Sequence, residues 1–284
     1  MTLLGAVWRS SHPGPTLMVT VLTVVLGIAV GLPPVRLAVV ALAVLAGQLT
    51  IGLSNDLLDA ERDRAVGRLD KPIAQGLVSA RAVTTVAVAC AVVGFVLPFT
   101  LGVGTGVAHA VLVASGLAYN AGLKSTVASV VPFVVSFGVL PAVVTLAAAP
   151  PTPPAAWALG VGAVFGVAIH FTNVLPDLGD DARTGVVGLP HRLGRLRAGL
   201  VAFCALGTAA GLAVVGQLTT GGTAERQSGI FAVAGAAVVV ALAVVGAIAV
   251  VRGRSSRLLF RLIMLAALVL VAQLATSGAA LTAG

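Results

Sequence analysis

The chain has 284 residues, of which 58% are hydrophobic and 9% charged, and its formal net charge is +8. A mean hydropathy of +1.10 argues against an ordinary soluble domain. Because aromatic residues make up only 4% and no basic tract stands alone, the positive charge does not indicate nucleic-acid binding.

Long apolar runs predict transmembrane helices, each of which needs about 20 mostly apolar residues. No Asp, Glu, Lys or Arg occurs in 10–35, 37–55, 82–123, 125–176, 198–224, 227–251 or 262–284. Two of these runs are long enough for two crossings, since glycines break the first at 102–106 and prolines break the second at 150–154. We therefore expect an all-α integral membrane protein, with nine transmembrane helices in one bundle and no separate soluble domain.

The basic residues predict orientation, because Lys and Arg favour the cytoplasmic side. With nine crossings and the N-terminus inside, the cytoplasmic segments are 1–9, 55–81, 120–126, 177–197 and 252–261. These segments hold 15 of the 17 basic and eight of the nine acidic residues. We expect a multi-pass protein of the cell (inner, cytoplasmic) membrane whose N-terminus and acidic segments face the cytoplasm.

The segment NDLLDAERDRAVGRLDKP, residues 55–72, contains five acids and four bases. Asn55, Asp59 and Asp63 are spaced four residues apart, so on a helix they form one stripe that continues the preceding apolar run, with Asp56 beside it. Each charge at the bilayer centre costs roughly 2.5–3.5 kcal/mol. The acids are therefore expected at the inner mouth of the bundle or in a wet cavity that opens to it.

A second acidic segment, NVLPDLGDDARTGVVGLPHRLG, spans residues 173–194 after the sixth predicted crossing. Asn173, Asp177 and Asp181 repeat the spacing of the first stripe on the same side of the membrane. Facing carboxylates repel one another unless a cation lies between them. Since hard oxygen ligands suit Mg²⁺, which also binds substrate phosphates, the two stripes predict a Mg²⁺ site.

Basic residues near both stripes can hold phosphate oxygens. They are Arg68, Lys71, Lys124 and Arg192. Carboxylates, Mg²⁺ and bases at the mouth of an apolar cavity indicate a substrate with a diphosphate head and a long hydrocarbon tail.

Three motifs, in order, resemble those of the UbiA superfamily of intramembrane prenyltransferases over essentially the whole chain. NDLLDAERDRAVGRLDKP at 55–72 is similar to the family's NDxxDxxxD with a downstream Arg and a basic-Pro pair. DLGDDARTGVVGLPHRLG at 177–194 is similar to DxxxDxxxG followed by Leu-Pro and Arg-Leu-Gly. YNAGLK at 119–124 looks like the family's short Tyr…Leu-Lys motif.

The resemblance implies that residues 1–284 are a single membrane-embedded prenyltransferase-like domain, a nine-helix bundle around a central cavity that opens sideways to lipid. It implies that two Mg²⁺ ions are held on the diphosphate by Asn55, Asp56, Asp59, Asp63, Asp177 and Asp181. Asp56 matches the same motif either as a ligand or as a residue that orients the ligands. The implied diphosphate contacts are Arg68, Lys71, Lys124, Arg192 and Asn173. Tyr119 is expected near the reacting end, and the catalytic set is Asp59, Asp63, Asp177, Asp181 and Tyr119.

The implied activity is Mg²⁺-dependent transfer of a prenyl group from an isoprenyl diphosphate to an unidentified aromatic or lipid-type acceptor within the bilayer. Two Mg²⁺ ions and the bases neutralise the leaving diphosphate, and the dry cavity shields the allylic cation. One alternative is a terpene cyclase of the same superfamily, in which the cation reacts with its own double bonds. Another is an ion-coupled transporter, which predicts charges near mid-span, whereas every acid lies outside the apolar runs.

Several details depart from the family pattern or stay open. Gly188 stands where a polar residue, often Thr, usually precedes Leu-Pro, and Asn120 stands where Ser or Thr is common, which leaves the acceptor open. His12 is expected to be interfacial structure, and His170 is a candidate cavity residue. Arg192 fits the pattern better than its neighbour His191. The glycine-rich segments 102–106 and 160–166 predict close helix packing.

Overall fold

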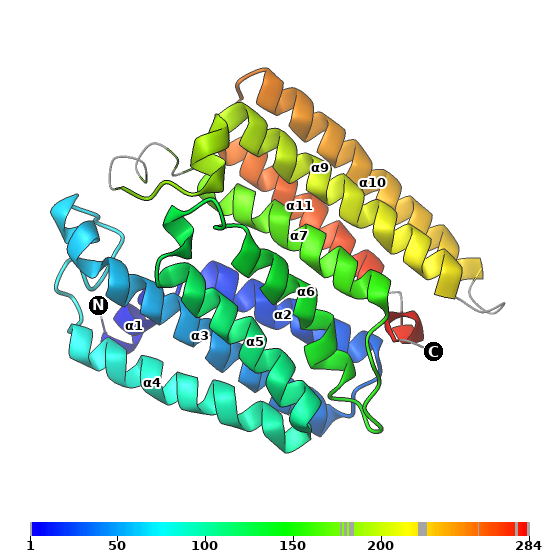
Figure 1. Ribbon diagram of the computed structural model, residues 1–284, viewed down its shortest axis with the longest axis horizontal. Helices are drawn as coiled ribbons and strands as arrows, with labels where there is room; N and C mark the ends of the chain where they lie inside the picture. The colour runs from blue at the N-terminus through cyan, green and yellow to red at the C-terminus, as the bar shows by residue number, and fades with distance from the viewer. Residues whose placement is uncertain are drawn as a thin grey trace.

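The computed structural model describes residues 2–176, 178, 181, 185–220, 226–254, 256–275 and 278–282, and these form an elongated helical bundle (Figure 1). This part of the chain contains ten α-helices and no named β-strand, which confirms the all-helical prediction. The α-helices are α1 (Leu3–Ser10), α2 (Pro13–Ala29), α3 (Pro34–Ala65), α4 (Ala80–Val96), α5 (Val103–Asn120), α6 (Val131–Thr145), α7 (Ala156–Val174), α9 (Leu189–Thr220), α10 (Arg226–Val251) and α11 (Ser256–Ala275). The short 3₁₀ helices are η1 (Leu97–Leu101), η2 (Leu123–Ser125) and η4 (Gly278–Leu281).

Proline and glycine set the helix boundaries. α2 and α3 begin at Pro13 and Pro34, where the missing N–H group leaves no helical hydrogen bond unmade. The apolar run 82–123 divides into α4 and α5 at η1 and at Gly102, whose φ of 134° strongly favours glycine. The run 125–176 divides into α6 and α7 across the proline-rich loop. Both breaks expected from the sequence are confirmed.

Five of the described helical segments are long and apolar enough to cross a membrane. They are Pro34–Ala65, Ala80–Leu101, Ala156–Val174, Leu189–Thr219 and Ala232–Val251. The bent pair α1–α2, with 72° between its helices, makes a sixth if it is counted as one span. α6 and the apolar part of α11 are shorter than a full crossing, so a multi-pass membrane protein is supported while the count of nine crossings stays a prediction.

Glycines allow α6 and α7 to pack closely. A Cβ atom on Gly162 would lie 2.1 Å from the carbonyl oxygen of Phe137, and one on Gly166 would lie 2.3 Å from that of Phe133. No residue with a side chain fits at either position without moving the backbone of α6. The expectation of close packing at 160–166 is therefore confirmed.

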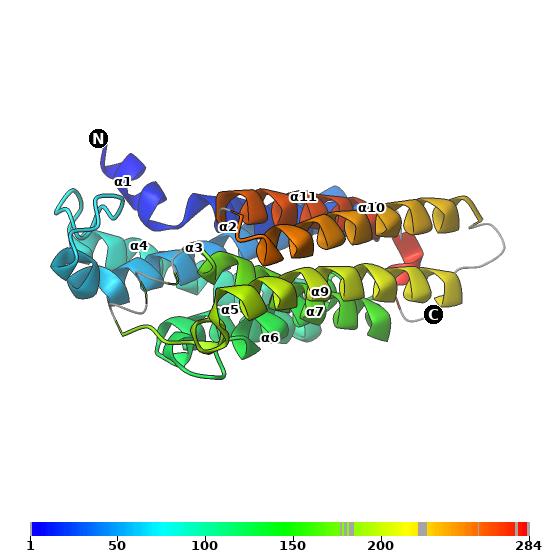
Figure 2. The same cartoon turned by 90° about the horizontal axis from the view of Figure 1, so that it is seen from above.

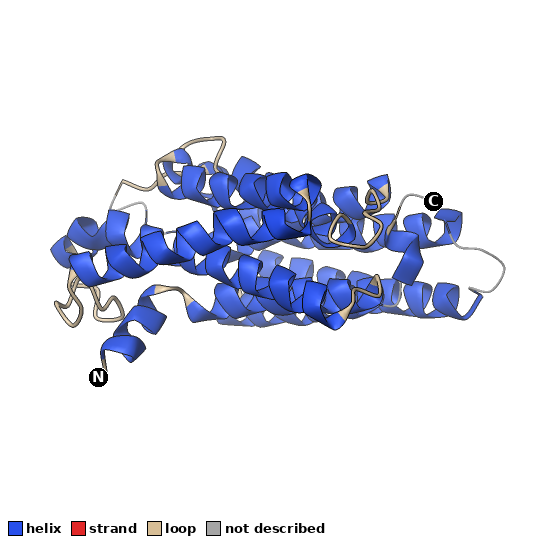
Figure 3. Cartoon of the chain, turned by 90° about the horizontal axis from the view of Figure 1, so that it is seen from below, coloured by secondary structure: helices blue, strands red, loops and turns tan. Residues whose placement is uncertain are grey.

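The long helices run side by side, and the connecting loops gather at the two ends of the bundle (Figures 2 and 3). α7 packs between α6 and α9, while α3 packs against α2, α4 and α5. The first described residues lie at one end of the bundle and the last at the other. The C-terminal ends of α3, α5 and α7 share the end where the chain begins, which brings the acidic segments together there.

Candidate functional site

A cavity of about 470 Å³, called the site cavity below, lies among the ends of five helices. Its walls come from the first turns of α2 and α6, from residues 48–63 of α3, from the last turns of α5 and α7, and from the segments that follow α3, α5 and α7. Nine residues singled out from the sequence line it: Asn55, Asp59, Asp63, Arg68, Lys71, Tyr119, Lys124, Asn173 and Asp181. Residues from both acidic segments therefore share one cavity.

The stripe on α3 is as the four-residue spacing predicts. Asn55, Asp59 and Asp63 occupy one face of the helix and all three line the site cavity. Asp59 is 7% exposed and Asp63 3% exposed. Two carboxylates one helical turn apart with so little water require cationic partners.

Two basic side chains supply that compensation. Lys124 Nζ donates to Asp59 Oδ1 at 2.5 Å. Arg62 Nη2 lies 2.9 Å from Asp59 Oδ2 and 3.8 Å from Asp63 Oδ1. Arg62 was not among the expected site residues, although its position three residues after Asp59 is a spacing at which helical side chains meet.

An amide pair fixes the orientation of Asn55. The Asn120 Nδ2 group donates to Ile51 O at 2.8 Å and to Ser54 Oγ at 2.9 Å, so its Oδ1 faces Asn55. Asn55 Nδ2 donates to that oxygen at 3.2 Å. The Asn55 carbonyl oxygen is therefore directed away from Asn120, which gives the departure from the family pattern at position 120 a structural role.

Asp56 lies behind the cavity wall. It is 2% exposed and is not among the residues that line the site cavity. Its Oδ1 accepts from Lys71 Nζ at 2.6 Å and lies 3.1 Å from His12 Nε2, while Lys71 and His12 are themselves 3.1 Å apart. Asp56 thus holds two nitrogen-bearing side chains at the rim, an arrangement different from the metal-ligand role expected for it.

The linker between α1 and α2 forms part of the cavity wall. Ser11 and His12 of the linker line it, next to Pro15 and Thr16 of the first turn of α2, and His12 has a left-handed backbone with φ of 55°. A Cβ atom on Gly52 of α3 would lie 2.1 Å from the Ser11 carbonyl oxygen. His12 is therefore a site residue that the sequence did not identify, since only this close approach brings the linker to the cavity.

Asp181 faces the cavity from the second acidic segment. His191 Nε2 lies 3.5 Å from Asp181 Oδ2, and the His191 side chain is 4% exposed. The Gly188 N–H donates to His191 Nδ1 at 3.2 Å, so in the neutral ring the proton is on Nε2 and points toward Asp181. Arg192, expected to contact the diphosphate, is exposed and does not line the cavity.

The remaining residue of the second stripe, Asp177, lies outside the described residues. Gly188, the other departure from the family pattern, has a steric reason. A Cβ atom there would lie 2.5 Å from the Lys124 carbonyl oxygen and 2.8 Å from Ser129 Oγ. The loop that carries Lys124 can approach this closely only because position 188 has no side chain.

Arg68 lines the site cavity and also contacts Asp70. Its Nε and Nη2 atoms donate to the two carboxylate oxygens of Asp70, each at 2.8 Å. This bidentate bond holds the pKa of Asp70 at about 2, well below its ordinary value. Asp70 therefore stays ionised and orients Arg68 at all physiological pH values.

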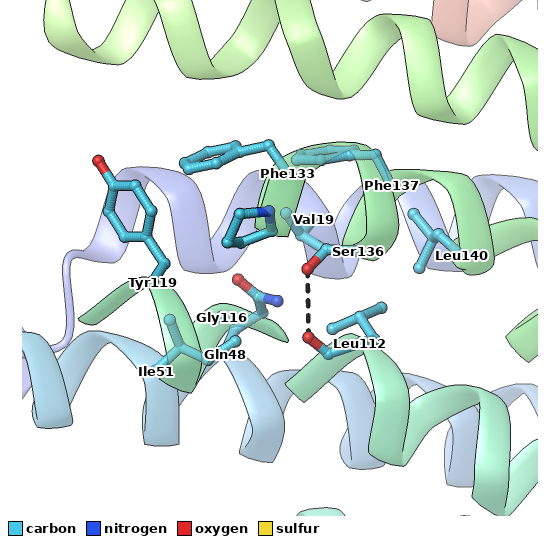
Figure 4. A pocket seen from close by; sticks show the side chains of 11 residues that line it. Val19, Gln48, Ile51, Leu112, Gly116, Tyr119, Phe133, Ser136, Phe137 and Leu140 are labelled. Atoms are coloured by element: carbon cyan, nitrogen blue, oxygen red, sulfur yellow. Dashed lines mark hydrogen bonds between the residues drawn. The ribbon is translucent and has the colours of Figure 1, made fainter. Parts of the chain in front are cut away.

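A smaller apolar cavity of about 90 Å³, the first chamber, adjoins the site cavity. Figure 4 shows the side chains that line the first chamber. The two cavities share Gln48, Ile51, Tyr119 and Phe133. The Tyr119 ring meets the Phe133 ring edge-on, with 5.1 Å between centroids. Tyr119 thus lies at the boundary between the charged mouth and the apolar interior, where the reacting end of a substrate was expected.

His170, a candidate cavity residue from the sequence, does not line the site cavity. It is 1% exposed, and its Nε2 lies 3.0 Å from Ser129 Oγ. That hydroxyl also accepts from the Leu189 N–H at 2.9 Å. His170 therefore joins α7 to the start of α9 and supports the wall from behind.

The oxygen donors of the cavity suit Mg²⁺. Asn55, Asp59, Asp63 and Asp181 present carboxylate and amide oxygens to one space, with no thiol among the lining residues. Within the described residues, no three His, Cys, Asp or Glu side chains are grouped closely enough to hold a metal ion. Lys124 and Arg62 occupy the Asp59 oxygens, so metal binding there requires these bases to move aside.

Comparison with known proteins adds a family and a fold. The model of the UbiA prenyltransferase family matches residues 16–269. No curated protein matches the chain in a sequence comparison. A digeranylgeranylglyceryl phosphate synthase has a similar structure, with 11% identity, a TM-score of 0.71, and coverage of 98% of this chain and 99% of that one.

Two structures of a UbiA homologue from Archaeoglobus fulgidus are also similar. The one bound to GPP and Mg²⁺ is 12% identical, with a TM-score of 0.72 and coverage of 97% of this chain and 99% of that one. The one bound to DMAPP and Mg²⁺ is 13% identical, with a TM-score of 0.73 and coverage of 95% and 97%. At these identities the likeness is one of fold.

Proposed function

Because the chain belongs to the UbiA prenyltransferase family, we propose that it ionises an isoprenyl diphosphate inside the membrane and transfers the prenyl group to an acceptor. The similar archaeal structures hold GPP or DMAPP together with Mg²⁺, which supports an allylic diphosphate as the substrate class. The acceptor is proposed only as an aromatic or lipid-type molecule that reaches the cavity from the bilayer.

One observation carries the proposal. The oxygens of Asn55, Asp59 and Asp63 face the same cavity as Asp181, and the bases Lys71 and Lys124 line it too. The cavity continues into an apolar chamber. A diphosphate head and a hydrocarbon tail need these two environments side by side.

The residues of the chain have distinct roles in this mechanism. Lys124 and Arg62, which compensate Asp59 in the structure, turn to phosphate oxygens when the substrate enters. Arg68 presents its guanidinium to the departing diphosphate and stabilises its growing charge. The Tyr119 and Phe133 rings exclude water and offer their π faces to the allylic cation.

Mg²⁺, when bound by Asn55, Asp59, Asp63 and Asp181, neutralises the diphosphate and makes it a better leaving group. We infer two ions, because both acidic segments contribute side chains to the cavity, and Asp177 of the second segment is proposed as a further ligand. Asn173 lines the same cavity and is proposed to bind the diphosphate or its metal. Nine crossings, with the cavity mouth and the N-terminus on the cytoplasmic side, are the topology proposed from the charge distribution.

A terpene cyclase is the second candidate, because aromatic rings cluster around the first chamber. The Phe133 and Phe137 rings are stacked with centroids 6.5 Å apart, and Tyr119 meets Phe133 edge-on. Such rings stabilise cations that migrate along a folded chain. An ion-coupled transporter is disfavoured, since the acids lie at the helix ends and not at mid-span.

Diphosphate release by the purified protein tests the proposal. The protein is given Mg²⁺ and a series of allylic diphosphates, with and without extracted membrane lipids as acceptors. Release that depends on the acceptor supports transfer, release with formation of cyclic hydrocarbons supports cyclisation, and no release from any diphosphate by folded protein refutes both.

Matched variants connect the activity to the site. Asp59→Asn and Asp181→Asn are expected to slow release at least about 100-fold, because each removes a charged oxygen donor. Glu61→Gln is the control, since Glu61 is an exposed acid on the same helix and does not line the cavity. Equal rates in all three variants would be incompatible with the proposed site.

A further inference from the structure

Two apolar compartments lined by described residues lie beyond the site. The first chamber, about 90 Å³, is followed by a second chamber of about 30 Å³. Phe137 and Leu140, one turn apart on α6, line both. These two side chains are therefore the wall at which the first chamber ends.

The length of the first chamber can be measured along α6. Phe133 lines its mouth end and Leu140 its far end, as Figure 4 shows. Seven residues separate them, which is about 10 Å at about 1.5 Å per residue. An isoprene unit adds four skeletal bonds of about 1.5 Å, or about 5 Å in length. The chamber is thus about two isoprene units long.

The second chamber is much smaller than the first. Its volume of about 30 Å³, against about 90 Å³ for the first chamber, is close to the share of one water-sized group in a liquid. The second chamber is too small for the five carbons of a further unit.

The wall is held rigidly. The Phe137 ring meets the Phe165 ring of α7 edge-on, with 5.5 Å between centroids, and Leu140 is 2% exposed. The backbone of Phe137 is pressed against Gly162, as the close packing of α6 and α7 requires. A longer chain must displace side chains in a tightly packed core, which costs free energy.

We propose that the substrate is a short isoprenyl diphosphate of about two isoprene units, and that Phe137 and Leu140 determine this chain length. The proposal rests on the function proposed above and makes it specific. It is not contained in the similarities of fold, since the similar proteins include a digeranylgeranylglyceryl phosphate synthase as well as structures with GPP and DMAPP.

The test compares dimethylallyl, geranyl, farnesyl and geranylgeranyl diphosphates in two measurements. The first is kcat/KM for diphosphate release. The second is the Kd of the corresponding thiolodiphosphates, which bind but ionise poorly. Wild-type protein is expected to prefer geranyl over geranylgeranyl by at least about tenfold in both, because misfit of single carbon groups already costs about tenfold or more.

Variants can enlarge the first chamber or fill it. Leu140→Ala and the milder Phe137→Leu are expected to reduce the preference for geranyl over geranylgeranyl by about tenfold. Val19→Phe fills the first chamber from α2 and is expected to shift the preference to dimethylallyl. Leu206→Ala is the matched control, since Leu206 is equally buried but lines none of the three cavities.

The outcomes separate the two proposals. Wild-type protein that prefers geranylgeranyl, or wall variants that are folded and keep the wild-type ranking, overturn the chain-length limit. If Leu140→Ala does not fold, the substrate preferences of Phe137→Leu and Val19→Phe decide whether the chain-length limit holds. If no diphosphate is released from any substrate, the proposed function fails, while the thiolodiphosphate series still determines whether the chamber selects a short chain.

Discussion

Replacing Asp56 by Asn separates two roles that its sequence motif cannot distinguish. As a metal ligand, Asp56 should affect metal binding as strongly as Asp59 does. In the structure it lies behind the wall and bonds to Lys71 and His12. We therefore expect Asp56→Asn to weaken diphosphate binding while leaving metal binding nearly intact.

The size of the effect follows from the burial of the pair. The Asp56 side chain is 2% exposed and that of Lys71 13%, so water screens their 2.6 Å contact weakly. Hydrogen bonds between charged groups contribute about 1.5–3 kcal/mol, and an amide keeps the shape but loses the charge. This free energy holds Lys71 toward the diphosphate, so the affinity of Asp56→Asn for the diphosphate is expected to fall about 10-fold to 100-fold.

The assay titrates Asp56→Asn and Asp59→Asn with Mn²⁺ in the presence of inorganic diphosphate, and then with a geranyl thiolodiphosphate. Asp56→Asn should change the Mn²⁺ affinity by less than about threefold, whereas Asp59→Asn should reduce it by about 10-fold or more. Equal loss of Mn²⁺ affinity in both variants would refute the reasoning and make Asp56 a ligand. Thermal unfolding in detergent verifies that both variants are folded.

Three further predictions concern the supports of the site. Gly52→Ala should lower the midpoint of thermal unfolding by an amount equivalent to about 1–3 kcal/mol, because the added Cβ atom meets the Ser11 carbonyl oxygen of the linker. Gly211→Ala is the control, since a Cβ atom at Gly211 meets open space and should leave the midpoint unchanged. Equal midpoints in the two variants contradict the close approach at Gly52. His191→Phe should weaken Mn²⁺ binding about 10-fold to 100-fold, because it removes the ring N–H that faces Asp181. His191→Gln keeps an N–H group and should weaken binding less. Identical losses of Mn²⁺ affinity in the two variants would mean that the ring only fills space. Asp70→Asn should lower the free energy of unfolding by about 1 kcal/mol or less, since water screens the partly exposed ion pair between Arg68 and Asp70. Because the pKa of Asp70 is lowered from 3.8 to about 2, its contribution to stability should be constant from pH 8 to pH 5, decline as the pH falls below 3.8, and be largely lost at about pH 2. A difference between variant and wild-type midpoints that changes between pH 8 and pH 5 contradicts this.

Helical periodicity was sufficient to predict one face of the site. Asn55, Asp59 and Asp63 share a face because four steps of 100° nearly complete a turn, and this holds in any α-helix. Asp56 is turned away from that face, and its partners come from segments that periodicity does not describe. The motif therefore identifies the stripe correctly but cannot tell a cavity residue from the one behind it.

Contacts between distant loops could not be predicted. His12 reaches the cavity because a left-handed linker packs on Gly52. The His191 ring is held by the Gly188 N–H, which donates to its Nδ1. A glycine in the sequence indicates freedom of the backbone but does not indicate which segment approaches it. The number of membrane crossings could not be predicted for a similar reason, since an apolar run does not reveal where its helix begins and ends.

The bond between Lys124 and Asp59 also has a consequence for biosynthesis. The two residues are 65 positions apart, so at about 5–20 residues per second the ribosome adds the lysine roughly 3–13 seconds after the aspartate. During that interval α3 is present without this cation, and its carboxylates must stay hydrated at the membrane surface. Arg62, on the same helix, is then the remaining partner of Asp59, so a nascent chain that stalls between α3 and α5 holds half a site in which Asp59 lacks one of its two bases.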